Sequence, residues 1–240
     1  GSSSRPIVRR CKFTNLDNFG ALYSSGSSWA LFEDCEATGC SGGSSKGGFS
    51  NTGFGAIYIN CVAVSCSTHG FSGAGNFCHY ENCIASTITG SACHGFASAA
   101  TPTFAYGCVA YSIANGFAFQ VAVESRYRNC IAEGSAGASG SFGWSGVASV
   151  RPFIINCAGW NNVVDVDPLI LPQIDSFKTL SASPFTNAAG GDFSLNNTVG
   201  AGDSCRGAGF TGGWPGLAST GYPDIGAVQS QATAAGGGLF

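Results

Sequence analysis

Hydrophobic and polar residues alternate along this chain in short runs, and the runs recur at a nearly constant interval. In the run Cys78-His79-Tyr80-Glu81 the aromatic side chain is out of phase with the charged ones. Alternation with a period of two predicts a half-buried β-strand, and the runs are too short for helices. We therefore expect strands with aromatic side chains pointing inward and charged side chains pointing outward.

A cysteine within the motif Asn-Cys-aliphatic-Ala marks each repeat. The anchor cysteines are Cys11, Cys35, Cys61, Cys83, Cys108, Cys130 and Cys157. Their successive spacings are 24, 26, 22, 25, 22 and 27 residues. A period in this range is typical of a solenoid, in which each repeat is one turn that buries its apolar face only by stacking on its neighbours.

Alignment of the repeats predicts three short strands per turn. The first strand carries a phenylalanine, at Phe49, Phe71, Phe96, Phe117 and Phe142. The second carries an aromatic residue three positions before the anchor cysteine, at Phe32, Tyr58, Tyr80 and Tyr127. The third carries an alanine two positions after the anchor, at Ala37, Ala63, Ala85, Ala110 and Ala132.

One column of residues between the second and third strands predicts a sharp bend. Its members are Asp34, Asn60, Asn82, Gly107, Asn129 and Asn156. These residue types share a tolerance of left-handed backbone conformation. The fold we expect is all-β: a right-handed, single-stranded parallel β-helix of about seven turns over 1–160, a C-terminal cap region over 161–230, and a flexible Ala/Gly tail over 231–240.

The chain has 12 cysteines. Because the anchors share one inward column, their parallel side chains are poorly oriented for disulfide geometry, so we expect a mostly reduced ladder of small buried groups. Cys40 and Cys66 share a second column with isoleucines in later turns. The cysteines that fall outside these columns, and so could form bridges, are Cys78, Cys93 and Cys205.

The Asn-Cys-Ile-Ala and Gly-Phe turns resemble those of the right-handed parallel β-helix superfamily, which includes pectate lyase-like enzymes and phage tailspikes. The segments after residue 165, Val166-Asp167-Pro168-Leu169, Gly191-Asp192-Phe193-Ser194-Leu195 and Pro223 to Val228, are similar to the "DPLF", "DFRL" and "DIGA" motifs that follow many bacterial and phage β-helices. This resemblance implies a structural cap. It specifies the fold much more closely than the function.

Carboxylates suited to polysaccharide cleavage are not evident in the pattern. Glu33 and Glu81 share a column, but Ile59 lies between them, which separates them by about two strand spacings. We therefore predict no catalytic residues and no cofactor. Asp165 and Asp167 could offer oxygen ligands to a hard cation, but turn capping by Asp before proline is the reading we favour, so we predict no metal site.

Three turns carry a polar residue at the entrance to the first strand. His69 and His94 each open a His-Gly-Phe sequence, and Asn115 precedes the next Gly-Phe. We predict that the three stack into a small polar column that either lines a turn or contacts a ligand. Trp144 is a further candidate ligand contact, because a tryptophan in a polar loop can stack on a sugar ring or, alternatively, close a gap beneath the loop.

Charge narrows the range of partners. The chain has 10 basic and 13 acidic residues and a charged fraction of only 10%. Such a chain lacks the positive field that attracts nucleic acid, and no apolar run is long enough to span a membrane. We expect neither nucleic acid nor membrane among its partners.

These features together favour a non-enzymatic structural or glycan-contacting module of a phage virion, such as a spike, fibre or capsid decoration. We expect it at the virion surface or outside the cell, as a homo-oligomer or part of a larger assembly, in contact with other virion proteins or a host polysaccharide. The alternatives are a secreted polysaccharide lyase or hydrolase and a bacterial surface adhesin or extracellular filament subunit.

Overall fold

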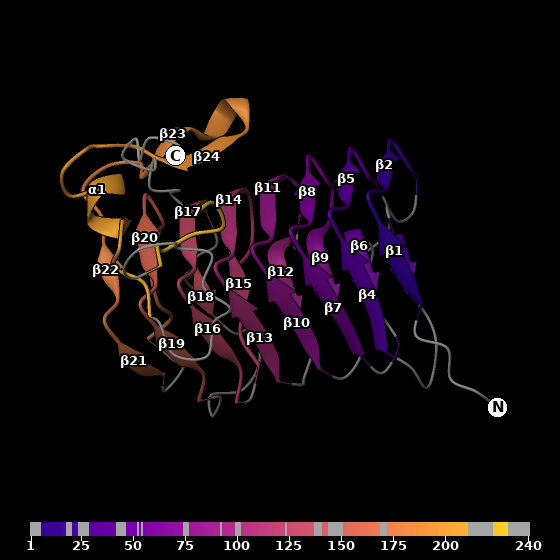
Figure 1. The fold of residues 1–240 in the computed structure, drawn as a ribbon, viewed down its shortest axis with the longest axis horizontal. Coiled ribbons are helices and arrows are strands. Elements are labelled where there is room, and N and C mark those ends of the chain that lie inside the picture. Colours follow the sequence, from indigo (N-terminus) through magenta and orange to yellow (C-terminus); the bar gives the residue numbers. More distant parts are fainter. Residues whose placement is uncertain are drawn as a thin grey trace, which may run out of the picture.

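The computed structural model describes the larger part of the chain. The described residues are 6–17, 21–23, 29–41, 47–51, 53, 55–73, 77–91, 93–98, 102–122, 124–136, 141–143, 151–168, 172–210 and 223–229. Parallel strands stack along the long axis of the molecule, with the first turn at one end and the last at the other (Figure 1). The fold is thus an all-β parallel solenoid, as the repeat predicts.

Three parallel sheets form its sides, and we name them by the side chains they bury. The Tyr sheet comprises Ile7–Arg9 (β1), Trp29–Glu33 (β4), Gly55–Ile59 (β7), Cys78–Glu81 (β10), Thr103–Tyr106 (β13), Arg126–Arg128 (β16), Phe153–Ile155 (β19) and Gln173–Asp175 (β21). The Ala sheet comprises Lys12–Thr14 (β2), Glu36–Thr38 (β5), Val62–Val64 (β8), Ile84–Ile88 (β11), Val109–Ile113 (β14), Ile131–Ser135 (β17), Ala158–Trp160 (β20) and Lys178–Thr179 (β22). The Phe sheet comprises Ala21–Tyr23 (β3), Gly47–Asn51 (β6), His69–Gly73 (β9), His94–Ser98 (β12), Phe119–Gln120 (β15) and Phe142–Gly143 (β18).

The solenoid has about five turns, fewer than the seven we expected. The Tyr and Ala sheets have eight strands each, but the Phe sheet has six, so all three sides are present over only the five steps between those strands. At the other end, β21 and β22 extend the Tyr and Ala sheets past residue 160, where we expected the solenoid to end.

Aromatic rings fill the core at the spacing of the strands. Phe49, Phe71 and Phe96 stack face to face, with centroids 5.0 and 4.9 Å apart. Tyr58 and Tyr80 form a parallel stack from the opposite sheet, 5.3 Å apart. Rings of the two stacks meet edge to face, which is a preferred arrangement of aromatic quadrupoles. The predicted inward phase of both strands is therefore confirmed.

The phenylalanine column departs from the prediction in one turn. Phe96 pairs with Phe119, not with the expected Phe117, and Phe119 continues to Phe142. The run Phe117-Ala118-Phe119 presents two phenylalanines in the same phase, and the structure places the second in the core stack. Phe117 instead lies over His94, with ring centroids 5.1 Å apart.

Two columns of left-handed residues turn the chain. The predicted bend column is confirmed, with φ between 48° and 58° from Asp34 to Asn156. A second column, not predicted, lies four residues after each anchor cysteine, at Asn15, Gly39, Ser65, Thr87, Ser112, Gly134 and Asn161. Because it includes serine and threonine, whose side chains do not favour this conformation, its composition does not reveal it.

All 12 cysteines are free thiols, and all except the half-buried Cys11 are buried. The anchor thiols donate weak hydrogen bonds to carbonyl oxygens; Cys83 Sγ lies 3.3 Å from Glu81 O and 3.4 Å from Tyr58 O. Burial raises the pKa of Cys66 to about 12. Burial also raises the pKa of the anchors Cys108 and Cys157 well above the ordinary value of a thiol, so these thiols are neutral and serve as small packing groups.

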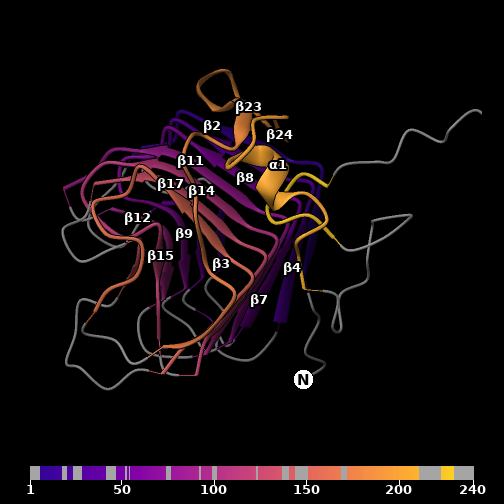
Figure 2. The ribbon, with the colours of Figure 1, turned by 90° about the vertical axis from the view of Figure 1, so that its left-hand side faces the viewer.

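The chain after β22 covers the outer face of the Ala sheet. A hairpin of Phe185–Asn187 (β23) and Asp192–Leu195 (β24), joined by the 3-10 turn Ala188–Gly190 (η1), lies on this face and is followed by the short helix Gly202–Cys205 (α1). Figures 1 and 2 show the hairpin above β14 and β17.

No helix in the described part of the chain has the length and hydropathy needed to cross a membrane.

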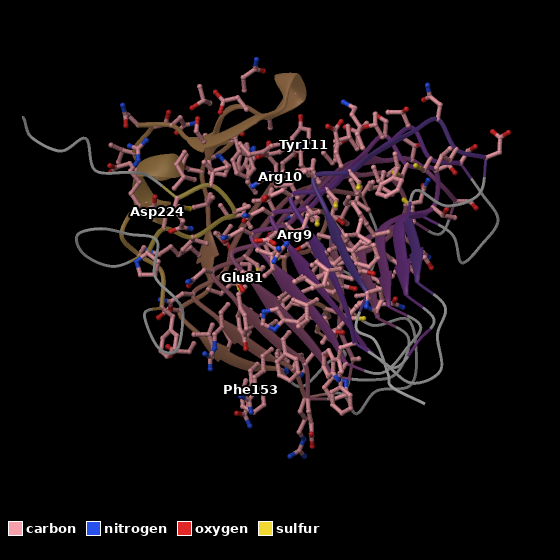
Figure 3. All side chains as sticks on the ribbon, turned by 45° about the vertical axis from the view of Figure 1, so that its right-hand side comes forward. Arg9, Arg10, Glu81, Tyr111, Phe153 and Asp224 are labelled. Atoms are coloured by element: carbon pink, nitrogen blue, oxygen red, sulfur yellow. The ribbon has the colours of Figure 1, made fainter. Side chains whose placement is uncertain are left out.

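Tail residues bind both the bend column and the Ala sheet. Asn129 accepts a hydrogen bond from Phe210 N–H and donates one to Phe210 O, and Asn156 donates one to Ala208 O at 2.9 Å. Tyr111, labelled in Figure 3, contacts Phe193 edge to face. The Phe193 and Ile225 segments therefore pack on the outer face of the Ala sheet, where Ile225 is fully buried. The core end itself is closed by other groups, since Phe177 meets Phe142 edge to face.

Candidate functional site

The outer face of the Tyr sheet carries one column of side chains from its first strand to its last. The residue four positions before each anchor cysteine points outward, in register from turn to turn. The column consists of Ile7, Leu31, Ile57, His79, Phe104, Arg126, Phe153 and Gln173. Its chemistry changes along the solenoid, from aliphatic at the first turns to aromatic and cationic at the later ones.

A groove of about 500 Å³ lies over the later turns of this column. Its floor comes from Phe104, Arg126, Phe153 and Gln173. Its wall comes from residues one or two positions before β10, β13, β16 and β19, namely Phe77, Pro102, Glu124 and Arg151. The wall residues are also in register, because each lies two positions before a member of the floor column or of its continuation at His79. The groove therefore follows two parallel columns across about four turns.

The guanidinium group of Arg126 is held between two aromatic rings. Its Cζ atom lies 6.0 Å from the centroid of Phe104 and 5.5 Å from that of Phe153, on the neighbouring strands. Contacts of this kind are weakly attractive through the ring quadrupoles. They place the guanidinium of the exposed Arg126 between the two rings on the outer face of the sheet. Phe153 is labelled in Figure 3 on the outer side of the strands.

A second, apolar hollow of about 450 Å³ lies over the first turns of the same face. Ile7, Leu31 and Ile57 of the outward column line it together with Trp29 and Ala30. The Trp29 ring lies against Gly55, where an added Cβ would approach ring atom Cε3 to 2.9 Å. None of these described lining residues carries a charge that could orient a ligand.

The histidine column forms in part as predicted. The rings of His69 and His94 stack 5.1 Å apart at an interplanar angle of 4°. Each ring accepts a backbone hydrogen bond from the next turn: His69 Nδ1 from His94 N–H at 3.1 Å, and His94 Nδ1 from Phe117 N–H at 3.0 Å. Each acceptor nitrogen must be unprotonated, so both imidazoles are neutral with the proton on Nε2.

Burial lowers the pKa of His69 and of His94 to about 4, and for His94 the neighbouring His69 lowers it further. A histidine held neutral in this way, with one nitrogen engaged by the backbone, stabilises the turn. This arrangement matches the turn-lining alternative of the prediction.

Asn115 is not part of this column, contrary to the prediction, because Phe117 occupies the place beside His94. The register of this turn is displaced by two residues, as in the phenylalanine column. Asn115 is exposed and donates a hydrogen bond to Gly90 O at 2.9 Å. Trp144 lies outside the described residues. Trp160 packs against the apolar cluster beneath the tail.

The carboxylates lie as the repeat predicts. Glu33 and Glu81 are both in register with Ile59, which separates them on the sheet. Asp165 Oδ1 accepts a hydrogen bond from Asn162 Nδ2 at 3.0 Å, and Oδ2 accepts one from Thr179 Oγ1 at 2.7 Å. The side chain of Asp165 thus serves to join turns. In the part of the chain that the structure describes, no three His, Cys, Asp or Glu side chains cluster to hold a metal ion.

The groove itself was missed by the sequence analysis, although the sequence holds a signal for it. The positions four and six residues before Cys108, Cys130 and Cys157 carry an aromatic ring, an arginine or a proline in five of six cases. Because the repeats were aligned by their inward residues alone, the pattern at these outward positions was not noticed. Strand register, seen in the structure, brings them onto one surface.

Comparisons with protein-family models, with curated proteins and with solved structures find no match to this chain.

Proposed function

We propose that this protein is a non-enzymatic β-solenoid module that contacts glycans through the groove on its Tyr sheet. The observation that carries the proposal is the pair of outward, half-buried rings, Phe104 and Phe153, on alternate strands with Arg126 between them. Aromatic faces provide flat apolar surfaces for sugar rings, and the polar groups beside them can bond to hydroxyls.

The shape of the groove also supports an extended ligand. Strands of one sheet are separated by about 4.8 Å, so the four floor residues extend over about 14 Å. A linear oligosaccharide could lie across the strands and meet a similar set of groups on each turn. A compact ligand would use only a small part of this surface.

A phage particle is the setting we propose, with a tailspike-like relationship within the β-helix superfamily. Free buried thiols suit a protein that folds in a reducing bacterial cytoplasm before release. The rigid stack of turns suits a spike or fibre that must project a binding surface, alone or in a homo-oligomer.

A screen of immobilised polysaccharides, neutral and acidic, tests the proposal. We expect saturable binding of at least one polysaccharide and no release of reducing ends. The double change Phe104→Ala and Phe153→Ala should weaken binding at least about tenfold, which corresponds to roughly 1.4 kcal/mol. Ile7→Ala, in the same outward column but outside the groove, is the matched control and should bind like the parent.

Three results would refute this assignment. Turnover of a bound polysaccharide would favour the lyase or hydrolase alternative. Binding that is unchanged in the Phe104/Phe153 variant, or absent across the whole panel, would remove the groove as the contact surface and favour a purely structural or adhesive role.

A further inference from the structure

We propose that the groove is specific for acidic glycans and holds a sugar carboxylate on Arg126 and Arg151. This inference rests on the proposed glycan-contacting function and adds to it the class of sugar. It is carried by the charges of the groove, by the position of one guanidinium between two rings, and by the backbone of two wall residues.

The charge of the groove matches a single negative group. Two arginines and one glutamate line it, which leaves one net positive charge. A chain with a formal net charge of −3 has concentrated two of its 10 basic residues here. Glu124 disfavours a doubly charged phosphate beside it, whereas a uronic or sialic acid carries a single charge on its carboxylate.

The chemistry and position of the Arg126 guanidinium suit a carboxylate. A guanidinium presents its donors in a planar fork that matches the two oxygens of a carboxylate, and such charge-assisted pairs are about twice as strong as neutral hydrogen bonds. The rings of Phe104 and Phe153 flank this guanidinium from the two neighbouring strands. When the guanidinium pairs with the ligand carboxylate, the two rings lie beside the sugar that carries it.

Backbone conformation singles out the wall of the groove independently. Phe77 and Glu124 have φ angles of 58° and 57°. Arg10 and Ser176 extend the first bend column at its two ends, so Phe77 and Glu124 are, among the described residues, the only non-glycine residues with positive φ outside the two columns. A left-handed conformation is costly for phenylalanine and glutamate, and costs of this kind concentrate at binding sites. Both strained residues line this one groove.

Both the wall and the floor of the groove therefore supply groups that bind the acidic sugar. Arg126 and Arg151 pair with the carboxylate, while Glu124 and Gln173 accept hydrogen bonds from sugar hydroxyls. Because a neutral sugar leaves both arginines without a partner in the bound state, the groove should discriminate against it.

The test compares matched ligands. Binding is measured by calorimetry for oligosaccharides that contain uronic or sialic acid and for the same oligosaccharides with their carboxyl groups reduced to alcohols. We expect reduction of the carboxyl groups to weaken binding at least about tenfold, which corresponds to roughly 1.4 kcal/mol. Sulfated oligosaccharides form a third arm, and we expect them to bind more weakly than the carboxylated ones.

Charge variants complete the test. Arg126→Gln and Arg151→Gln should each remove most of the preference for the carboxylated ligand, and Arg126→Lys should restore it only in part. Arg9→Gln makes the same change in net charge at the far end of the same sheet and should leave binding unchanged. Raising the salt concentration should weaken the binding of the acidic ligand and leave the binding of the neutral ligand unchanged.

The outcomes separate the two proposals. Equal binding of carboxylated and reduced ligands, unaffected by Arg126→Gln, would overturn the acidic specificity and leave the glycan-contacting function standing. Stronger binding of the sulfated arm would also overturn the carboxylate assignment. A lack of binding to every ligand, acidic or neutral, would overturn both.

Discussion

Tyrosines at equivalent positions of one inward column differ in whether their hydroxyl groups form a hydrogen bond. The hydroxyl of Tyr127 donates a hydrogen bond to Gln120 O at 3.1 Å. The hydroxyl of Tyr58, in the same inward column, is buried and has no hydrogen-bond partner among the described residues. Phe32 occupies this column one turn earlier without a hydroxyl. The column therefore requires an aromatic ring, and only some turns use the hydroxyl.

Removal of the two hydroxyls should have opposite effects. Tyr58→Phe should raise the free energy of unfolding by about 1 kcal/mol, because it deletes an unsatisfied buried polar group. Tyr127→Phe should lower it by about 1 kcal/mol, because it deletes a satisfied one. Urea denaturation of both variants measures the difference. Equal losses in the two variants would show that the Tyr58 hydroxyl is satisfied in solution.

The second bend column allows a similar comparison of backbone conformation. Thr87 has a φ of 56° at a position that other turns fill with asparagine, glycine or serine. Thr87→Asn should stabilise the protein by about 1 kcal/mol, because asparagine tolerates the left-handed region better than a β-branched residue. Thr14→Asn, on an exposed strand next to the same column, is the control. No gain from Thr87→Asn would contradict the conformation assigned to this bend.

At the scale of the strands, inward columns could be predicted from the sequence, and register in one turn could not. The spacing of the anchor cysteines sets the Tyr and Ala sheets almost completely. The Phe sheet follows loops of variable length, and Phe117 and Phe119 are both in phase for burial. A slip of two residues keeps every side chain on its face, so the hydrophobic pattern cannot detect it. The same slip moved Asn115 out of the histidine column.

The histidine column makes a prediction about pH. His69 and His94 are neutral when folded, with a pKa of about 4, whereas an unfolded histidine titrates near its ordinary value of about 6.5. The unfolded chain binds more protons between these values, so folding stability should fall as the pH drops from about 6.5 to 4, by up to about 3 kcal/mol per histidine.

A double variant isolates this effect from the titration of carboxylates. His69→Asn with His94→Asn keeps a side-chain acceptor for the two backbone N–H groups and removes the titrating rings. Thermal melting of parent and variant across this pH range should give a steeper loss for the parent. Parallel curves would mean that the imidazoles are not held neutral by the fold.

At the scale of the whole molecule, the tail is part of the folded unit. It buries the outer faces of Val109, Ile131 and Ala158 under Phe185 and Phe193. The sequence indicates that a solenoid needs its apolar surface covered, because an isolated turn exposes it. It does not indicate which side the tail covers, since that depends on where the chain turns after β22. The outward apolar residues of the Ala sheet are the feature of the sequence that corresponds to this contact.

A buried carboxylate beneath the tail should make the contact sensitive to pH. Burial raises the pKa of Glu133, which accepts a hydrogen bond from Ser183 Oγ at 2.9 Å. Its contribution to stability is therefore fully present below the unfolded pKa of about 4.3 and is lost as the pH rises through the raised folded value. Glu133→Gln should stabilise the protein at pH 8, by about 1 kcal/mol, and have little effect at pH 4.

Glu36→Gln serves as the comparison, because the ammonium group of Lys12 holds the pKa of Glu36 below its usual value. Removal of the Glu36 carboxylate should lower the stability of the fold at neutral pH, whereas Glu133→Gln should raise it. Melting temperatures at the two pH values measure both. A destabilising effect of Glu133→Gln at pH 8 would show that the carboxylate is paired with a cation that the described contacts do not include.

The groove on the Tyr sheet forms because strand register aligns single residues of successive turns into one surface, which a long ligand could follow. A crystal structure of the protein with a saturating carboxylated oligosaccharide tests this most directly. The account predicts a sugar ring on Phe104 or Phe153, with its carboxylate on Arg126 or Arg151. An empty groove, or a ligand bound over His69 and His94 on the Phe sheet, would contradict it.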